Sequence, residues 1–198
     1  LNRLGVNTVY GVLLHRSSDM LGDRGSNVIR SLKRLKLNGM SQKTGVSIYD
    51  PTELDYIPKG VGIDIVQAPL NIVDRRQETS GWLKRLSAQG IEIHTRSTFL
   101  QGLLIIPRNA IPKKFERWSK LWDMWHSGLN KYQCTATAAC LSYPLSLPEV
   151  DRVVVGLDSK RQLEELTSIA KMNVTPYDWT FMMSDEERLI NPQHWTRL

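Results

Sequence analysis

The chain contains five short apolar runs, and each of them ends at a polar residue or a glycine. The runs are Val9–Leu14 before His15, Thr44–Val46 before Ser47, Ile63–Val66 before Gln67, Ile91–Thr95 before Arg96 and Ser97, and Arg152–Val155 before Gly156. Short runs of this kind are typical of strands buried on both faces, which belong to parallel sheets. Because functional side chains of such sheets follow the carboxyl ends of the strands, the pattern predicts a parallel sheet with its chemistry at one edge.

Helical patterns alternate with these runs. Ser26 is a candidate N-cap for a helix that carries Leu32 and Leu35 on one face, and Ser80 for a helix that carries Leu83. Further helices are expected over residues 51–57, after Pro112, over residues 135–141, and from Ser159 onward. Trp118, Trp122 and Trp125, in the helix after Pro112, are expected to pack in the core or on a subunit face rather than to bind a ligand. The repeated alternation of strand and helix predicts an α/β fold in which helices cover a parallel sheet.

Composition argues against several classes of partner. The net charge is +6, but the lysines and arginines are scattered rather than gathered in a stripe with aromatic residues, so no nucleic-acid partner is expected. No apolar run approaches the roughly 20 residues of a membrane span, and no secretory signal is recognised. We therefore expect a cytoplasmic protein without a membrane partner, whose ligand is an anionic small molecule.

The cysteines and histidines show no ligand spacing. Cys134 and Cys140 are six residues apart in a segment of helical pattern, which separates them by about 9 Å along a helix axis and places them on different faces. A disulfide between them is therefore not expected, and neither is a metal site. Both should be free thiols.

The number of strands constrains the fold class. A Rossmann fingerprint of the form G-x-G-x-x-G is absent after the first strand. A (β/α)8 TIM-type barrel needs eight strands in about 250 residues, and only five are found here. Leu1–Gly5 has the character of a last helical turn, so we expect a truncated chain in which the first three βα units are absent. Residues 1–198 would then form a single domain, a partial barrel, with residues 176–198 as a C-terminal tail packing on it.

Five motifs stand in a fixed order along the chain. They are Leu13-Leu14-His15-Arg16, Thr44-Gly45-Val46-Ser47, Val66-Gln67-Ala68-Pro69-Leu70-Asn71 with Asp74-Arg75, Arg96-Ser97 through Gln101-Gly102-Leu103-Leu104, and Val155-Gly156 with Gln162-Leu163-Glu164-Glu165. In this order they resemble the fourth to eighth strands of the aldo-keto reductase family, which implies a (β/α)8 barrel. The chain departs from the family pattern at Arg96, where an aromatic residue is common, and at Leu166, where asparagine is common.

The resemblance implies a role for each motif. His15 would be the catalytic histidine that polarises the substrate carbonyl, while Ser47 and Gln67 would bind the nicotinamide carboxamide. The remaining cofactor-binding residues that the resemblance implies are Arg96, Ser97, Phe99, Gln101 and Gly102 at the nicotinamide and pyrophosphate, and Gly156, Ser159, Gln162 and Glu165 at the adenosine half. Backbone N–H groups would bind most of the phosphate oxygens.

The resemblance also implies a function. The protein would be an oxidoreductase that reduces an aldehyde or ketone by hydride transfer from NADP(H) or NAD(H). The charges of Asp158 and Lys160 give opposite indications for the 2′-phosphate of NADP(H). The ending Leu189–Pro192 with Trp195 resembles bacterial members associated with surface sugars, which suggests a sugar-derived substrate. The family's proton-donating tyrosine, with its lysine and aspartate, lies on strands before the histidine strand, so this chain alone would lack them and be inactive.

Other readings stay open. The chain could be a catalytically incomplete or non-enzymatic nucleotide-binding module of the same fold that acts through protein partners. It could also be an unrelated barrel enzyme such as an aldolase, although no predicted strand ends in the lysine that a Schiff base requires. His15, Ser47 and Gln67 could be ordinary polar ends of buried strands, and Glu165 a surface charge. An unclosed sheet leaves two edges, so a homo-oligomer or a missing N-terminal segment is expected to complete the barrel.

Overall fold

The five predicted strands form one sheet. The computed structural model describes residues 1–58, 60–172 and 177–197. The strands are β1 (Val9–Leu14), β2 (Ser41–Ser47), β3 (Ile65–Pro69), β4 (Glu92–Arg96) and β5 (Arg152–Val153), in the sheet order β1-β2-β3-β4-β5. β1 pairs with β2 and β2 with β3 in parallel, with Leu14 opposite Val46 and Val46 opposite Val66. The predicted α/β class and parallel sheet are confirmed.

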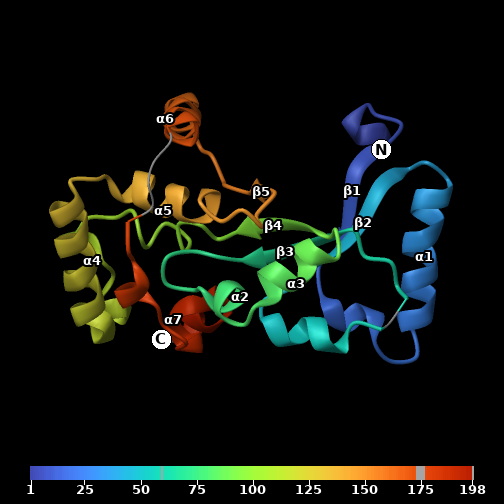
Figure 1. Ribbon diagram of the computed structural model, residues 1–198, viewed down its shortest axis with the longest axis horizontal. Coiled ribbons are helices and arrows are strands. Elements are labelled where there is room, and N and C mark those ends of the chain that lie inside the picture. The colour runs from blue at the N-terminus through green and yellow to red at the C-terminus, as the bar shows by residue number, and fades with distance from the viewer. Residues whose placement is uncertain (59, 173–176, 198) are drawn as a thin grey trace. The chain divides into compact units, whose positions relative to one another are not determined.

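Helices connect the strands. They are α1 (Gly25–Leu37), α2 (Arg76–Thr79), α3 (Trp82–Ala88), α4 (Ser119–Tyr132), α5 (Ala136–Leu145), α6 (Lys160–Lys171) and α7 (Glu187–Ile190) (Figure 1). The longer 3-10 helices are Pro51–Tyr56 and Lys113–Trp118, where helical turns were expected, and Pro192–Arg197. Within the described residues, none of the helices combines the length and the apolar character needed to cross a membrane.

Neither of the two predicted helix caps, Ser26 and Ser80, occupies the cap position. α1 begins at Gly25, so Ser26 lies inside its first turn and Arg24 occupies the cap position. A Cβ on Gly25 would lie 2.1 Å from the Met20 carbonyl oxygen, so a close backbone contact places the start of α1 at a glycine. α3 follows Gly81, whose φ of 78° suits glycine, and Ser80 lies one residue further out. Ser159 does cap α6, because its side chain accepts a hydrogen bond from Gln162 N.

The chain divides into two compact units, which are described separately. The first unit comprises residues 1–68 and 77–94, and the second comprises residues 69–76 and 95–198. In the first unit α1 lies beside β1 and β2 (Figure 1). Its core contains Val46, Ile65 and Val66, which are almost completely buried. Gly45 permits the close approach of β2 to β3, since a Cβ there would lie 2.1 Å from the Ile65 carbonyl oxygen.

A polar cluster lies at the amino ends of the strands in the first unit. Tyr10 from β1, Lys43 from β2 and His94 from β4 all bind the Glu92 carboxylate, with His94 Nε2 at 3.0 Å from Glu92 Oε2. The Lys43 ammonium also lies 5.3 Å from the centroid of the Tyr10 ring. Burial opposes ionisation of Glu92, but the hydrogen bonds from Lys43, Tyr10 and His94 outweigh it and lower the pKa of Glu92 to about 2.

The second unit is built around tryptophans. Trp122 and Trp125 of α4 are buried, as expected, and Trp125 Nε1 donates to the Leu104 carbonyl oxygen at 2.9 Å. The C-terminal tail contacts this core, with the ring centroids of Trp179 and Trp125 4.7 Å apart and Ser184 N donating to Val73 O at 3.0 Å. Residues 176 and 198 of the predicted tail lie outside the described residues.

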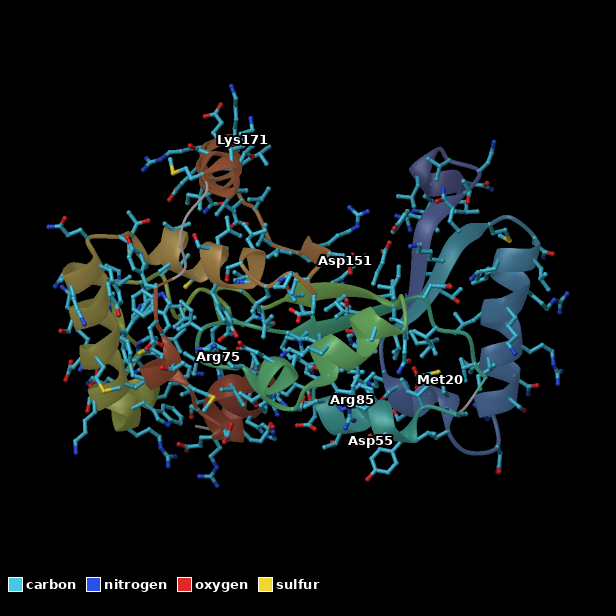
Figure 2. All side chains as sticks on the ribbon, viewed as in Figure 1. Met20, Asp55, Arg75, Arg85, Asp151 and Lys171 are labelled. Atoms are coloured by element: carbon cyan, nitrogen blue, oxygen red, sulfur yellow. The ribbon has the colours of Figure 1, made fainter. Side chains whose placement is uncertain are left out.

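α6 is held in the second unit by few contacts. Only Leu166 and Ile169 of this helix are buried, and they pack with Leu141 of α5. Most of its other side chains extend outward, as Figure 2 shows around Lys171 at its last turn. Both predicted free thiols are confirmed. Cys140 lies inside α5 and is fully buried, and Cys134 lies before α5 and is partly buried.

Replacing Gly45 by alanine should destabilise the protein. The added Cβ meets the backbone of Ile65, which cannot rotate away, so we expect the free energy of unfolding to fall by about 1–3 kcal/mol. Urea unfolding followed by circular dichroism measures this change. Gly156→Ala is the matched control, because the same methyl group enters open space there. Equal stability of the Gly45 variant and the wild type would contradict the close packing of β2 on β3.

Glu92→Gln should remove a pH-dependent part of the stability. Because the folded pKa of Glu92 is lowered, its stabilisation is present above the unfolded value of about 4.3 and is lost as the pH falls toward 2. We expect the variant to be less stable at pH 7 by on the order of 1 kcal/mol, and the difference to vanish near pH 2. Urea titrations at a series of pH values test this, with exposed Asp55→Asn as control. A difference that is independent of pH would refute it.

Candidate cofactor site

Three of the predicted site residues lie on or directly after neighbouring strands of the first unit. His15 comes directly after β1 and is exposed, and Ser47 is the last residue of β2 and is buried. Ser47 is opposite Gln67 in the pairing of β2 with β3, and Ile48 N donates to Gln67 O at 2.9 Å. Leu14 is opposite Val46, so the next residues of the two strands in the same register are His15 and Ser47. The structure therefore brings these three residues to the same level of adjacent parallel strands, with Gln67 two residues before the end of β3.

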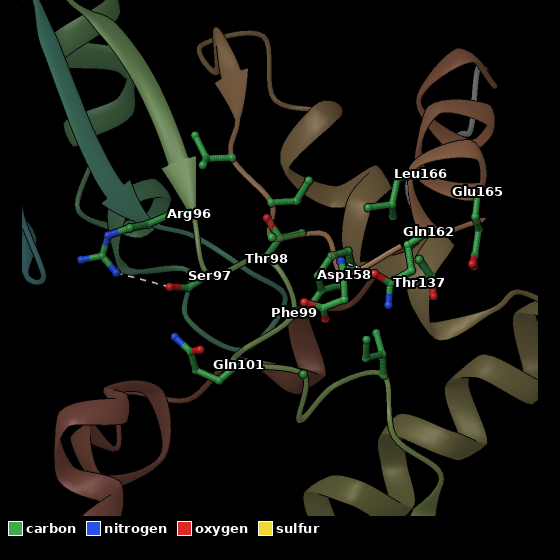
Figure 3. Close-up of a pocket in the computed structure, with 15 residues that line it drawn as sticks. Arg96, Ser97, Thr98, Phe99, Gln101, Thr137, Asp158, Gln162, Glu165 and Leu166 are labelled. Carbon is green, nitrogen blue, oxygen red and sulfur yellow. Dashed lines mark hydrogen bonds between the residues drawn. The ribbon is translucent and has the colours of Figure 1, made fainter. Parts of the chain in front are cut away.

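The second unit contains a pocket of about 590 Å³. Small-molecule sites in proteins fall in the range of roughly 300–1,000 Å³. The lining residues come from the end of β4 and the turn after it, from α5, and from the segment that runs from β5 into α6. They are Arg96, Ser97, Thr98, Phe99, Gln101, Gly102, Ile105, Thr137, Val154, Val155, Gly156, Asp158, Gln162, Glu165 and Leu166 (Figure 3).

The turn after β4 has an unusual backbone. Ser97, Leu100 and Gln101 have φ values of 63°, 46° and 54°, and Gly102 has a φ of 86°. Non-glycine residues rarely adopt this left-handed conformation, and each costs of order 1–3 kcal/mol unless the surroundings enforce it. Leu100, Gln101 and Gly102 adopt this conformation in succession.

Buried contacts hold this turn in place. Asn71 is fully buried, and its Nδ2 donates to the Ser97 carbonyl oxygen at 3.1 Å. Leu100 and Leu104 are also fully buried, and Leu100 N donates to Ser97 O at 2.8 Å. The apolar side chains thus anchor one side of the turn in the core and leave the other side to face the pocket.

Several hydrogen-bond donors of this turn have no partner within the described part of the chain. The backbone N–H groups of Ser97, Thr98, Phe99 and Gln101 donate no hydrogen bond to described residues, and Thr98 Oγ1 is buried and unpaired. Thr98 is only 2% exposed, so its hydroxyl lacks bulk water. Buried polar groups are nearly always paired, and one that is not calls for a ligand or an ordered water. These donors fit the oxygens of a phosphate.

The α6 side of the pocket has a different chemistry. Ser159 Oγ caps the helix, and the Gln162 side chain accepts a hydrogen bond from Asp158 N at 2.7 Å. Leu166 offers an apolar surface there, and the carboxylates of Asp158 and Glu165 also line this side. On the opposite side, Arg96 Nη1 donates to Ser97 Oγ at 3.3 Å (Figure 3). Among the described lining residues, Arg96 is therefore cationic, and Asp158 and Glu165 carry carboxylates.

Most of the predicted cofactor residues of the second unit line this one pocket. These are Arg96, Ser97, Phe99, Gln101, Gly102, Gly156, Gln162 and Glu165, whereas Ser159 is outside the lining and acts as the cap of α6. Five lining residues were not among the predicted site residues, namely Thr98, Ile105, Thr137, Val154 and Val155. Thr98 lies inside the predicted phosphate segment, and its position between Ser97 and Phe99 is the one signal that could have marked it.

A nicotinamide dinucleotide fits this set of residues. Its pyrophosphate needs N–H and cationic donors, which the turn after β4 and Arg96 supply, while its adenine needs an apolar surface, which Leu166 and Val155 supply. The unpaired Thr98 hydroxyl is an additional donor at the phosphate end. Among the described residues, no three histidine, cysteine, aspartate or glutamate side chains gather in a group that could hold a metal ion.

Comparison with known proteins supports the same family over most of the chain. The model of the Aldo/keto reductase family matches residues 1–184. The NADH-specific methylglyoxal reductase of Escherichia coli (strain K12) is 25% identical over 206 residues, which cover 96% of this chain and 62% of that protein.

Solved structures show the same fold. The aldo-keto reductase AKR11C1 from Bacillus halodurans, in its apo form, matches 100% of this chain and 64% of its own length with a TM-score of 0.74 and 22% identity. The glycerol dehydrogenase AKR11B4 from Gluconobacter oxydans matches 90% of this chain with a TM-score of 0.58 and 20% identity. The chain thus spans less than two thirds of the length of each of these relatives. From the family match over residues 1–184, with the strand order and the site residues described above, the chain belongs to the aldo/keto reductase family.

Proposed function

We propose that the pocket of the second unit binds NAD(H) or NADP(H). The observation that carries this proposal is the set of unpaired donors at the turn Ser97–Gly102, which includes the buried Thr98 hydroxyl and lines a pocket with Arg96. The pyrophosphate lies over this turn, and Arg96 offsets its negative charge. The adenosine half extends toward α6, where Gln162 and Leu166 contact it.

We propose further that the protein is a carbonyl reductase. The bound nicotinamide supplies a hydride to the carbonyl carbon. Ser47 and Gln67 hold the carboxamide by hydrogen bonds, which fixes one face of the nicotinamide ring toward the substrate. His15 donates a hydrogen bond to the carbonyl oxygen and so polarises the carbonyl. The three residues support these roles because they lie at the same level of adjacent parallel strands.

We propose that residues 1–198 are one domain, namely the part of a (β/α)8 barrel that runs from the histidine-bearing strand to the C-terminal tail. The single family match that crosses both compact units supports this, as does a structural relative matched along 100% of this chain but 64% of its own length. The relative that reduces methylglyoxal makes a small aldehyde or ketone the favoured substrate class, and a sugar-derived carbonyl is the second candidate.

Tyr10 is too far from His15 to be the proton donor for the carbonyl oxygen. Tyr10, Lys43 and Glu92 form a hydrogen-bonded cluster, but Tyr10 lies at the amino end of β1 and His15 follows its carboxyl end. Five residues of extended strand separate the two by about 16 Å along the chain. Tyr10 therefore cannot give a proton to a carbonyl that His15 contacts. We propose that the 198 residues bind the cofactor and orient a carbonyl but do not supply the proton.

Arg96→Gln should weaken binding of NADH to the 198-residue chain. Loss of a charged donor at the phosphate end should raise the Kd about tenfold. Isothermal titration calorimetry with NADH measures the change, and Arg188→Gln, an exposed arginine on α7 outside the pocket, is the matched control. An unchanged Kd in the Arg96 variant would count against the proposed orientation of the cofactor.

Thr98→Val separates binding from stability. The Thr98 hydroxyl has no partner in the protein, so its removal should leave Tm unchanged or higher while the Kd for NADH rises about threefold to tenfold. Thr95→Val is the comparison, because Thr95 is equally buried but donates to Arg152 O and should lower Tm when its hydroxyl is lost. A lower Tm with unaltered NADH binding in the Thr98 variant would show that the hydroxyl serves the fold and not a ligand.

The 198-residue chain should bind NADH without reducing methylglyoxal. The missing step is protonation of the oxygen, so NADH absorbance at 340 nm should fall no faster with the chain than with buffer alone. His15→Ala should leave NADH binding intact, because His15 contacts the substrate. If the chain instead oxidises NADH, and His15→Ala abolishes this turnover, then the proton donor lies within these residues and the proposal on this point is wrong.

A further inference from the structure

The C-terminal segment, residues 184–197, packs against the turn that follows β3. Ser184 N donates a hydrogen bond to Val73 O at 3.0 Å, and Leu189 of α7 is fully buried. An ion pair adds to these contacts, because Arg76 Nη1 donates to Glu187 Oε1 of α7. All of these residues belong to the second unit. The position of the C-terminal segment is therefore tied to the turn after β3.

Arg76 joins two carboxylates. Its Nε lies 2.9 Å from Asp74 Oδ1 and its Nη2 lies 3.0 Å from Asp74 Oδ2, while Nη1 binds Glu187. The Asp74 side chain is 1% exposed and that of Arg76 14%, whereas that of Glu187 is 47% exposed. Because the donors of a guanidinium have a fixed planar geometry, the two carboxylates together hold Arg76 in one orientation.

The Glu187 carboxylate is itself held by its own segment. Asn191 Nδ2 donates to Glu187 Oε2 at 3.3 Å, and His194 Nε2 lies 3.7 Å from the same oxygen. One oxygen of Glu187 therefore faces the C-terminal segment and the other faces Arg76. A change in the docking of this segment would reach Arg76 through a single carboxylate.

Asp74 is connected to the turn that lines the pocket. Asp74 N donates to Asn71 Oδ1 at 2.9 Å, and Asn71 N donates to Asp74 O at 3.1 Å. At the other end of the same side chain, Asn71 Nδ2 donates to Ser97 O at 3.1 Å. Ser97 has a φ of 63° and lines the pocket. A continuous path of hydrogen-bonded residues thus runs from Glu187 through Arg76, Asp74 and Asn71 to Ser97.

We propose that docking of the C-terminal segment and binding of phosphate at the turn Ser97–Gly102 are coupled through this path, and that Glu187 and Arg76 are positioning residues for the turn. The inference rests on the proposed function, which places the pyrophosphate of the cofactor on this turn. The ion pair of Glu187 with Arg76 holds Asp74, and through it the Asn71 side chain that Ser97 requires. A bound phosphate stabilises the same arrangement of Ser97. Since coupling between two sites is reciprocal, the phosphate also favours the docked segment.

Glu187→Gln tests the effect of the segment on the pocket. The change keeps the size of the side chain and removes the charge that binds Arg76, so the Kd of the 198-residue chain for ADP should rise about threefold in calorimetric titration. The Tm should stay almost unaltered, because other anchors of the segment remain, such as Trp118 Nε1 on Glu186 Oε2 at 2.7 Å. Asp185→Asn is the matched control with an unchanged Kd, because Asp185 is an exposed carboxylate of the same segment outside this path.

The reciprocal effect is measured in the wild-type chain and needs no variant. The amides of Leu189, Ile190 and Asn191 donate hydrogen bonds within α7 and just after it, so their hydrogen exchange reports the docking of the segment. Saturating ADP should slow this exchange about threefold, and Glu187→Gln should abolish the slowing. A purely structural role of Glu187 would instead speed the exchange equally with and without ADP.

The outcomes separate this inference from the function on which it rests. If ADP binds the wild-type chain without slowing exchange in α7, and Glu187→Gln leaves the Kd unchanged, the coupling is overturned and the phosphate site stands. An equal rise of the Kd in Asp185→Asn would reveal a general effect of charge and overturn the role of Glu187. If ADP does not bind the wild-type chain, the proposed function fails, and this inference fails with it.

Discussion

One buried side chain, that of Asn71, links the turn after β3 to the turn after β4. Its Nδ2 donates to the Ser97 carbonyl oxygen, while its Oδ1 accepts from Val73 N and Asp74 N. Since Asn71 is fully buried, a broken bond would leave a polar group unpaired at a cost of about 1–3 kcal/mol. That constraint keeps Ser97 in its left-handed conformation, and the donors that face the pocket depend on it.

The two ends of the pocket are built differently. At the β4 end, residues in the left-handed conformation present backbone N–H groups, and burial of the leucines of the turn offsets the energetic cost of that conformation. At the α6 end, side chains dominate, because Ser159 and Gln162 satisfy the first N–H groups near the helix and Asp158 and Glu165 add negative charge. In our proposal the first end holds the pyrophosphate and the second end contacts the adenosine half of the cofactor.

The sequence predicted the positions of the five strands because each apolar run is short and ends at a polar residue or a glycine. It was less successful where backbone contacts decide the structure. Ser26 is a good cap by residue type, yet α1 begins two residues earlier than a cap at Ser26 would place it, where Gly25 is in close contact with Met20. Ser159 was predicted to bind the cofactor, but its hydroxyl accepts a hydrogen bond from Gln162 N and caps α6. The unpaired state of Thr98 depends on its surroundings in three dimensions, which no local pattern contains.

The most direct test of the account is a titration of the isotopically labelled 198-residue chain with ADP, followed through its backbone amide resonances. ADP carries the pyrophosphate and the adenosine but no nicotinamide, so it isolates the pocket of the second unit. The account predicts the largest shifts at the amides of Ser97, Thr98, Phe99 and Gln101, with smaller shifts in the first turn of α6. Shifts confined to other parts of the chain, or no saturable shifts at millimolar ADP, would contradict the central claim that this strained turn is a phosphate site.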